Sequence, residues 1–129
     1  MRLLKIIWIS LTLTLALPLA AQQVPAELVK AFKEGDARVL SDYFHKSLEM
    51  TILEKDYVVS KEQASRIMEE FFKNNKPVDF VISFGGEKDD SHYSIGSLKT
   101  KDKSFRVNLF FIESADNKRL IYFMSIEAD

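Results

Sequence analysis

The chain has 129 residues, of which 47% are hydrophobic and 29% are charged, and it contains no cysteine. The absence of cysteine excludes a disulfide framework, a thiolate metal site, a cysteine nucleophile and the acylated cysteine of a bacterial lipoprotein. The formal net charge is −1 and no basic cluster is longer than a pair such as Lys118-Arg119, which argues against nucleic acid as a partner, because phosphate binding needs a basic stripe.

Residues 1–21 are predicted to be a secretory signal peptide. Arg2 and Lys5 precede an apolar run of 12 residues, 6–17, and small residues precede Gln22. This is the order of regions in a signal peptide, and the run is shorter than the about 20 apolar residues that a membrane-spanning helix needs. Leu19 departs from the small-residue cleavage pattern, and an uncleaved signal anchor is the alternative. We expect an exported protein, periplasmic or secreted, with no stable membrane span.

Residues 22–129 are predicted to form a single domain. Removal of residues 1–21 leaves 108 residues and a net charge of −3. A chain of this length can bury roughly two thirds of the surface that it exposes when unfolded. It can therefore fold without disulfides or a structural metal.

The first half of this domain is predicted to be mainly helical. Pro25 suits the first turn of a helix that Gly35 ends, and Asp36 can cap a second, short helix. Ser60 opens the clearest helix, because Gln63 completes a capping-box pattern. The apolar faces of the three helices are, in order, Leu28, Val29 and Phe32; Val39, Leu40, Tyr43 and Phe44; and Ala64, Ile67, Met68, Phe71 and Phe72. Between the second and third helices, residues 48–53 alternate as a strand and residues 57–59 form a short extended piece.

The second half is predicted to be a four-stranded antiparallel meander. Its strands are residues 78–84, 92–100, 105–113 and 120–127, and its turns are residues 85–90, 101–102 and 115–117. Connections this short make each neighbouring pair a hairpin.

Both faces of this meander are predicted to be apolar. One face holds Phe80, Ile82, Phe84, Phe105, Val107, Leu109, Phe111, Leu120, Tyr122, Met124 and Ile126. The other face includes Val81, Ile95, Phe110, Ile112, Ile121 and Phe123. The helices can cover only one of the two, so the second face is expected to meet a second copy of the chain or another envelope protein. The alternative is that strong twist, with Pro77 and Gly96, lets the strand ends curl over part of this face.

The order of elements resembles the nuclear transport factor two-like superfamily, also called SnoaL-like or cystatin-like. The residues behind the resemblance are Gly35-Asp36 between the first two helices, Leu40-x-x-Tyr43-Phe44 before the first strand, and Lys61-x-x-Ala64-x-x-Ile67-Met68-x-x-Phe71-Phe72 in the third helix. More narrowly, the chain is similar to small exported bacterial domains of unknown function. The resemblance implies an α+β fold in which a cone-shaped, curved antiparallel sheet packs against three helices around a pocket. It also implies dimerisation through the outer sheet face, and it implies no particular activity, because the fold hosts enzymes and non-enzymes alike.

Five residues are candidates to line a ligand pocket: Tyr43, His45, Tyr57, His92 and Tyr122. His45 is expected at the end of the second helix, where the helix dipole favours an imidazolium, and His92 is expected at the mouth of a strand. Either histidine could act as a general base, although a cap or rim position is the commoner role. The two lack the close spacing of metal ligands, so no metal site is predicted.

A non-enzymatic domain that binds a small apolar ligand or a protein is favoured over an enzyme. Members of the superfamily that resemble ketosteroid isomerase or SnoaL hold an Asp or His with tyrosines inside the cone. Here the predicted inner face of the meander has no carboxylate, because Asp79 lies on the other face, and Asp56 is the only further acidic candidate. The alternative is an enzyme that uses His45 or His92 with a tyrosine. No cofactor and no catalytic residue are predicted.

Two further patterns have simple structural interpretations. The aromatic residues Phe71, Phe72, Phe80, Phe84, Phe105, Phe110 and Phe111 are predicted to pack in the core. The acidic residues of 87–90 suggest calcium, but they lack the ligand spacing of a calcium loop, so a solvated turn is predicted.

Overall fold

The computed structural model of the chain describes residues 24–88 and 91–129. The predicted signal peptide, together with Asp89 and Asp90 of the acidic turn, lies outside these residues. The elements in chain order are α2 (Ala26–Glu34), α3 (Ala37–Ser41), β1 (Phe44–Ile52), β2 (Lys55–Ser60), α4 (Lys61–Asn74), β3 (Pro77–Lys88), β4 (Ser91–Thr100), β5 (Ser104–Glu113) and β6 (Arg119–Ala128). Within the described residues, no helix is both long and apolar enough to cross a membrane.

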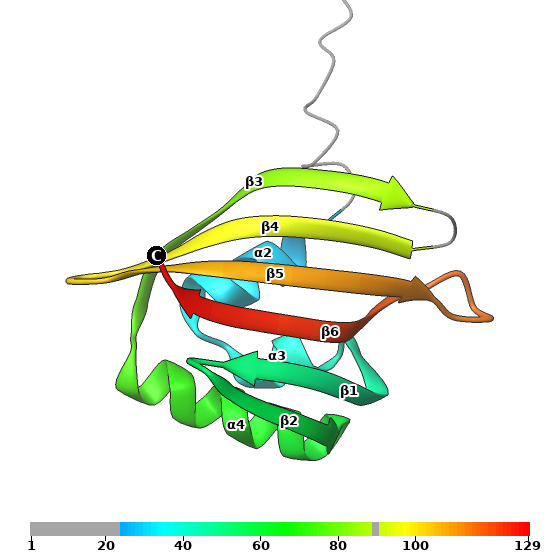
Figure 1. The fold of residues 1–129 in the computed structure, drawn as a ribbon, viewed down its shortest axis with the longest axis horizontal. Helices are drawn as coiled ribbons and strands as arrows, with labels where there is room; N and C mark the ends of the chain where they lie inside the picture. The colour runs from blue at the N-terminus through cyan, green and yellow to red at the C-terminus, as the bar shows by residue number, and fades with distance from the viewer. Residues whose placement is uncertain (1–23, 89–90) are drawn as a thin grey trace, which may run out of the picture.

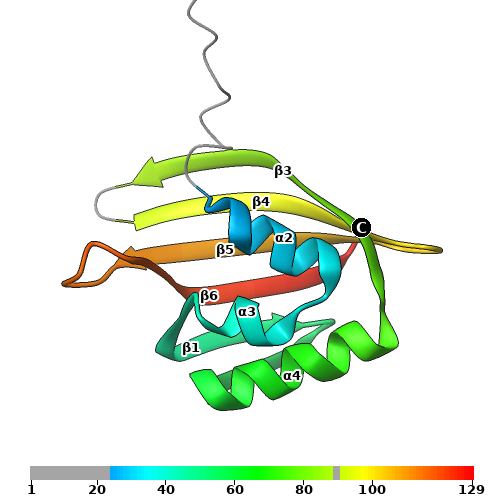
Figure 2. The same cartoon turned by 180° about the vertical axis from the view of Figure 1, so that it is seen from behind.

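Six strands form one mixed sheet in the order β2-β1-β6-β5-β4-β3. β1 runs parallel to β6, and every other neighbouring pair is antiparallel. The predicted four-stranded meander is confirmed as β3 to β6, and the β1–β2 hairpin extends the sheet beyond β6. The sheet is curved, and α2, α3 and α4 all lie on one side of it, which we call the inner side (Figures 1 and 2). The predicted α+β architecture is therefore confirmed, with an inner face that helices cover and an outer face that they leave uncovered.

Local capping signals place the helix ends as predicted. α2 ends at Gly35, whose φ of 68° lies in the left-handed region that glycine adopts without strain. The Asp36 side chain accepts a hydrogen bond from the Val39 backbone N–H at 3.1 Å and so begins α3. Ser60 and Gln63 form the reciprocal capping box of α4. Each such cap stabilises its helix by about 1 kcal/mol.

The end of the second predicted helix is wrong. α3 stops at Ser41, so Tyr43 and Phe44 do not belong to its apolar face, and β1 starts at Phe44 rather than at residue 48. The cause is pairing with β6, since the Ile121 backbone N–H donates to the Tyr43 carbonyl at 2.7 Å and Phe44 lies opposite Ile121. A strand contact distant in sequence has overridden the local helical pattern.

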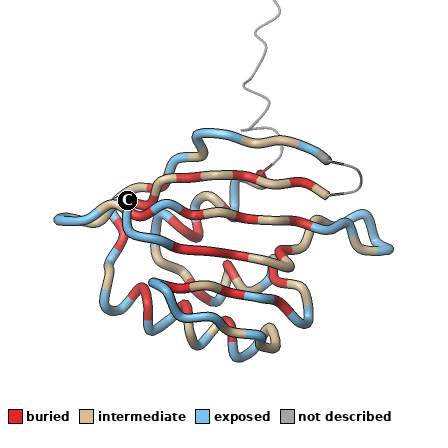
Figure 3. The backbone as a smooth tube through the Cα atoms, in the orientation of Figure 1, coloured by how far each residue is buried: buried red, intermediate tan, exposed pale blue. Residues whose placement is uncertain are grey.

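Aromatic and aliphatic residues of the helices and of the inner face form the core. Figure 3 shows buried positions along both the strands and the helices. Phe32 of α2 stacks on Phe80 of β3 with ring centroids 4.6 Å apart and meets Phe72 of α4 edge-on at 6.3 Å. The inner-face residues predicted on β5 are all buried: Phe105, Val107, Leu109 and Phe111. Each large side chain buried in this way contributes about 1.5–3 kcal/mol of transfer free energy.

Two bulges change the predicted sheet faces. The register of β3 on β4 shifts between Ile82 and Phe84, and the register of β5 on β6 shifts between Phe110 and Phe111. One extra residue in a strand moves the following side chains to the opposite face. Phe84, predicted on the inner face, is therefore 53% exposed, and Ile121, predicted on the outer face, is completely buried.

The first predicted turn of the meander is shorter than expected. Gly85 and Gly86 pair with Ser94 and Tyr93 and so belong to β3, which continues to Lys88. The long hairpin places Glu87 directly opposite His92.

Candidate functional site

A row of aromatic side chains crosses the outer face of the sheet. We call it the outer aromatic row; its members are Phe84 of β3, Tyr93 of β4, Phe110 of β5, and Tyr122 and Phe123 of β6. Ring centroids are 5.8 Å apart for Phe84–Tyr93 and 6.0 Å for Tyr93–Phe110. Phe110 then contacts Tyr122 at 6.4 Å and Phe123 at 5.4 Å. The row joins β3 to β6, which are neighbours in the sheet. The helices lie on the other side of these strands (Figure 1).

Aliphatic side chains widen this row into a patch. Ile112 is 41% exposed and Ile95, opposite Phe84, is half-buried. Val81 is 52% exposed but lies farther along β3, in register with Ser97 and Arg106. The prediction that Phe84 and Phe110 pack in the core is wrong, because both lie on the outer face. Of the other five residues predicted for this face, four also lie there, namely Val81, Ile95, Ile112 and Phe123, whereas Ile121 does not.

Gly86 allows the row to lie close to the sheet. It pairs with Tyr93, and a Cβ atom at Gly86 would lie 2.7 Å from the Tyr93 ring. The ring therefore covers the β3 backbone at a position that only glycine leaves open.

The other end of the outer face is polar. Arg106 lies opposite Glu127, and Asn108 Nδ2 donates to Ser125 Oγ at 2.8 Å. Cross-strand pairs of this kind stabilise a solvated sheet surface. The outer face thus has an apolar end and a hydrated end, and the two are built from the same strands.

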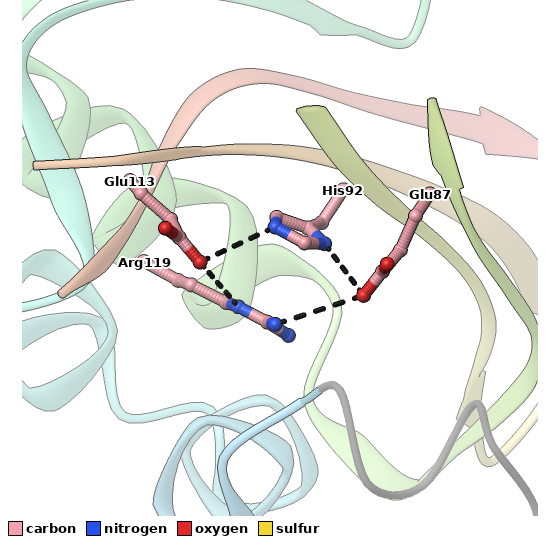
Figure 4. Close-up of polar contacts among 4 residues, drawn as sticks. All are labelled: Glu87, His92, Glu113 and Arg119. Carbon is pink, nitrogen blue, oxygen red and sulfur yellow. Dashed lines mark ion pairs between the residues drawn. The ribbon is translucent and has the colours of Figure 1, made fainter. Parts of the chain in front are cut away.

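A charged cluster lies on the inner side, at the end of the sheet where the β3–β4 and β5–β6 turns lie. We call it the His92 cluster; it consists of Glu87, His92, Glu113 and Arg119, one residue from each of β3 to β6 (Figure 4). His92 Nδ1 lies 3.1 Å from Glu87 Oε1, and His92 Nε2 lies 3.4 Å from Glu113 Oε1. Arg119 closes the ring with contacts of 3.8 Å to Glu87 and 3.7 Å to Glu113. His92 is buried, with 10% of its side chain exposed, while about half of each carboxylate side chain faces solvent.

The geometry of the His92 cluster is that of a structural ion-pair network. Both ring nitrogens of His92 face carboxylate oxygens, and Arg119 contacts both carboxylates. The Nδ1 contact is short but badly angled, and Nδ1 has no hydrogen bond of good geometry. The two carboxylates lie on opposite sides of the ring, so one metal ion could not reach all three groups. In residues 24–88 and 91–129, no group of three or more His, Asp or Glu side chains is arranged so that it could hold a metal ion.

The other predicted site residues lie in separate places. Tyr43 donates to Glu27 Oε2 at 3.2 Å; burial raises the pKa of its phenol, and the hydrogen bond and charge of Glu27 raise it further. His45 lies in β1 rather than at a helix end, and its Nδ1 is 3.0 Å from the Ser47 carbonyl oxygen. The helix-dipole argument for His45 is therefore wrong.

Tyr57 and Tyr122 are the remaining predicted site residues, and they lie on different parts of the surface. Tyr57 of β2 lines a surface groove beside α4, whereas Tyr122 belongs to the outer aromatic row. Asp56 points to the surface and accepts a hydrogen bond from Thr51 Oγ1 at 2.8 Å. Among the described residues, no hydrogen bond, ion pair or ring contact joins two of the five predicted residues.

Sequence reasoning missed Glu113 and Arg119. Glu113 and Arg119 pair across the β5–β6 hairpin, and they lie next to the cross-strand pair of Glu87 and His92. Their positions at the end and start of neighbouring strands could have indicated an ion pair, but the contact with His92 depends on the register of three hairpins.

The interior of the cone is occupied by protein. Phe44, Phe111, Met68 and Met124 are each at most 1% exposed. Surface hollows lie outside this interior, among them one of about 420 Å³ between α4 and the β1–β2 hairpin and one of about 830 Å³ between α4 and the α2–α3 turn.

Comparison with known proteins finds a matching family and solved structures of its members. The model of a domain of unknown function, DUF4783, matches residues 25–127. Crystal structures of DUF4783 family proteins from Bacteroides ovatus and Bacteroides uniformis are 33% and 34% identical, with TM-scores of 0.78 and 0.77. These matches cover 84% and 82% of this chain and 97% of each of those chains.

A more distant structure shows the fold alone. An NTF-2-like protein of unknown function from Silicibacter pomeroyi is 14% identical over 85% of this chain and 93% of its own, with a TM-score of 0.62. The resemblance to the nuclear transport factor two-like superfamily is thereby confirmed at the level of the fold. A search of curated proteins gave no match.

Proposed function

The chain belongs to the DUF4783 family, a family of unknown function, and we propose that it is an exported, non-enzymatic interaction domain that pairs through its outer sheet face. The observation behind this proposal is the outer aromatic row. Aromatic residues are enriched at the centres of protein interfaces, where they supply large contact areas. Contiguous apolar patches of this kind are uncommon on monomers.

The occupant that we propose is a second copy of the chain. A twofold pair would place the same patch on both sides of the interface, so Phe110 at the centre of the row would lie near its own symmetry mate. An envelope protein with an apolar surface is the other candidate partner. The hydrated end of the face would then form the rim of the interface.

Sedimentation of residues 22–129 at micromolar concentration tests the pairing. About five sixths of this chain matches 97% of each of the two Bacteroides family structures. This supports testing the domain without residues 1–21. We expect a dimer for the unmodified domain and a monomer for Phe110→Glu, because the substitution buries an unpaired charge in the interface.

The control for this experiment is Lys73→Glu. Lys73 is exposed on α4, which packs on the inner side of the sheet, so this variant should remain dimeric. A monomeric unmodified domain would exclude the second copy as the partner.

Export is the second part of the proposal. Its support is the order of basic residues, apolar run and small residues in 1–21. Mass spectrometry of the protein from its own host should find a chain that begins at or near Gln22, outside the cytoplasm. A chain that retains residues 1–17 would contradict it.

An enzyme of the SnoaL type is the second candidate, and one observation favours it. His92 is buried on the inner face among charged groups, as a catalytic histidine often is. Two others favour the interaction domain: both nitrogens of His92 already face carboxylates, and apolar side chains fill the cone.

A further inference from the structure

A groove between α4 and the tip of the β1–β2 hairpin has the features of a small-molecule site. Its volume is about 420 Å³, within the usual range for ligand pockets. Ile52, Tyr57, Ile67 and Phe71 supply apolar lining from three different elements. The β1–β2 turn and the end of α4, which line the groove, lie at the opposite end of the sheet from the β3–β4 turn (Figures 1 and 2).

Two basic side chains line this apolar groove. Lys55 and Arg66 both line it and both are exposed. Neither takes part in an ion pair within the described parts of the chain. The one acidic residue of the lining, Glu70, accepts a hydrogen bond from Asn74 Nδ2 at 3.4 Å. The groove therefore combines an apolar wall with an excess of positive charge.

Leu53 adds an independent observation. It lines the groove, is 42% exposed and has a φ of 48°, and Glu54 beside it has a φ of 73°. This left-handed conformation strains a bulky residue, and glycine or asparagine is usual in such a turn. A strained and exposed leucine is unfavourable for folding alone, but it extends the apolar wall of the groove.

We propose that this groove binds a small amphipathic carboxylate, with its hydrocarbon chain against Leu53 and Ile67 and its carboxylate between Lys55 and Arg66. Arginine suits this role because its planar guanidinium can pair with both oxygens of a carboxylate. The proposal is independent of pairing through the outer face, which lies on the other side of the sheet.

Titration of the isotopically labelled domain, residues 22–129, with decanoate below its micelle concentration tests the proposal by NMR. We expect saturable shifts of the backbone amides of residues 52–57 and 66–75. Decanol, which has the same chain and no charge, should bind about tenfold more weakly or worse, since it loses a charge-assisted contact. Equal binding of decanol, or shifts centred on the outer aromatic row, would overturn the proposal.

Two variants with the same change in charge sharpen the result. Arg66→Gln should weaken decanoate binding about tenfold, whereas Lys73→Gln should leave it unchanged. Lys73 belongs to the same helix but lines the hollow beside the α2–α3 turn instead. Equal losses in the two variants would show only a general effect of net charge. The monomeric Phe110→Glu variant should bind decanoate normally, which separates this proposal from the one about pairing.

Discussion

The two faces of the sheet differ in what they contact rather than in how apolar they are. On the inner face, Phe80 and Phe111 are at most 3% exposed beneath the helices. On the outer face, Phe84 is 53% exposed and packs only along the surface, against Tyr93. Aromatic residues of the same strand can therefore either stabilise the folded monomer or form a surface for contacts with a partner, depending on which face of the sheet they occupy. Hydrophobicity alone does not identify the core of this domain.

Substitution of one phenylalanine on each side should show the largest difference. Phe32→Ala removes a ring that is fully buried between Phe80 and Phe72, and it should lower the free energy of unfolding by about 3–5 kcal/mol. Phe84→Ala on the outer face should cost about 1 kcal/mol or less in the monomer, because much of the ring is already hydrated. Urea unfolding of both variants in the monomeric Phe110→Glu background measures the difference. Similar losses would mean that the outer row is part of the folding core.

Two glycines provide a smaller and more closely matched comparison. A Cβ atom at Gly96 on the inner face, or at Gly86 on the outer face, would lie 2.7 Å from an aromatic ring, that of Phe80 or Tyr93. Gly96→Ala should cost about 1–3 kcal/mol, because Phe80 is enclosed and the Val81 carbonyl oxygen is also only 3.0 Å away.

Gly86→Ala should cost less than about 1 kcal/mol, because the half-buried Tyr93 ring can turn toward solvent. It should nevertheless weaken pairing of the domain, since that turn disrupts the outer aromatic row. Urea unfolding measures the first effect and sedimentation measures the second. A larger stability loss for Gly86→Ala than for Gly96→Ala would reverse the distinction between the faces.

Features set by neighbouring residues could be predicted from the sequence, and features set by strand register could not. The Ser60–Gln63 capping box and the Gly35 helix end depend on three or four consecutive residues, and both are confirmed. The faces of Phe84 and Ile121 depend on bulges, which appear only when a strand meets its partner. Alternation along a single strand contains no signal for such a shift.

The candidate site shows the same limit. The residue type of His92 is enough to make it a candidate site residue. Its burial and its contacts with Glu87, Glu113 and Arg119, however, require four strands in register. The outer face could be predicted in outline because Val81, Ile95, Phe110 and Ile112 follow simple alternation. The groove beside α4 could not, because its wall joins a helix to a hairpin turn in an unusual conformation.

The place of β6 between β1 and β5 has a consequence for the order of folding. The β1–β2 hairpin and the three-stranded β3–β5 segment share no strand pairing until the last strand of the chain inserts between them. The parallel contact of Met50 with Met124 closes a loop of more than 70 residues, so its entropy cost is met late and slows folding relative to a helical domain. Until then, β1 and β5 each present an unpaired edge, and a chain that lacks its final residues would keep both edges open to aggregation.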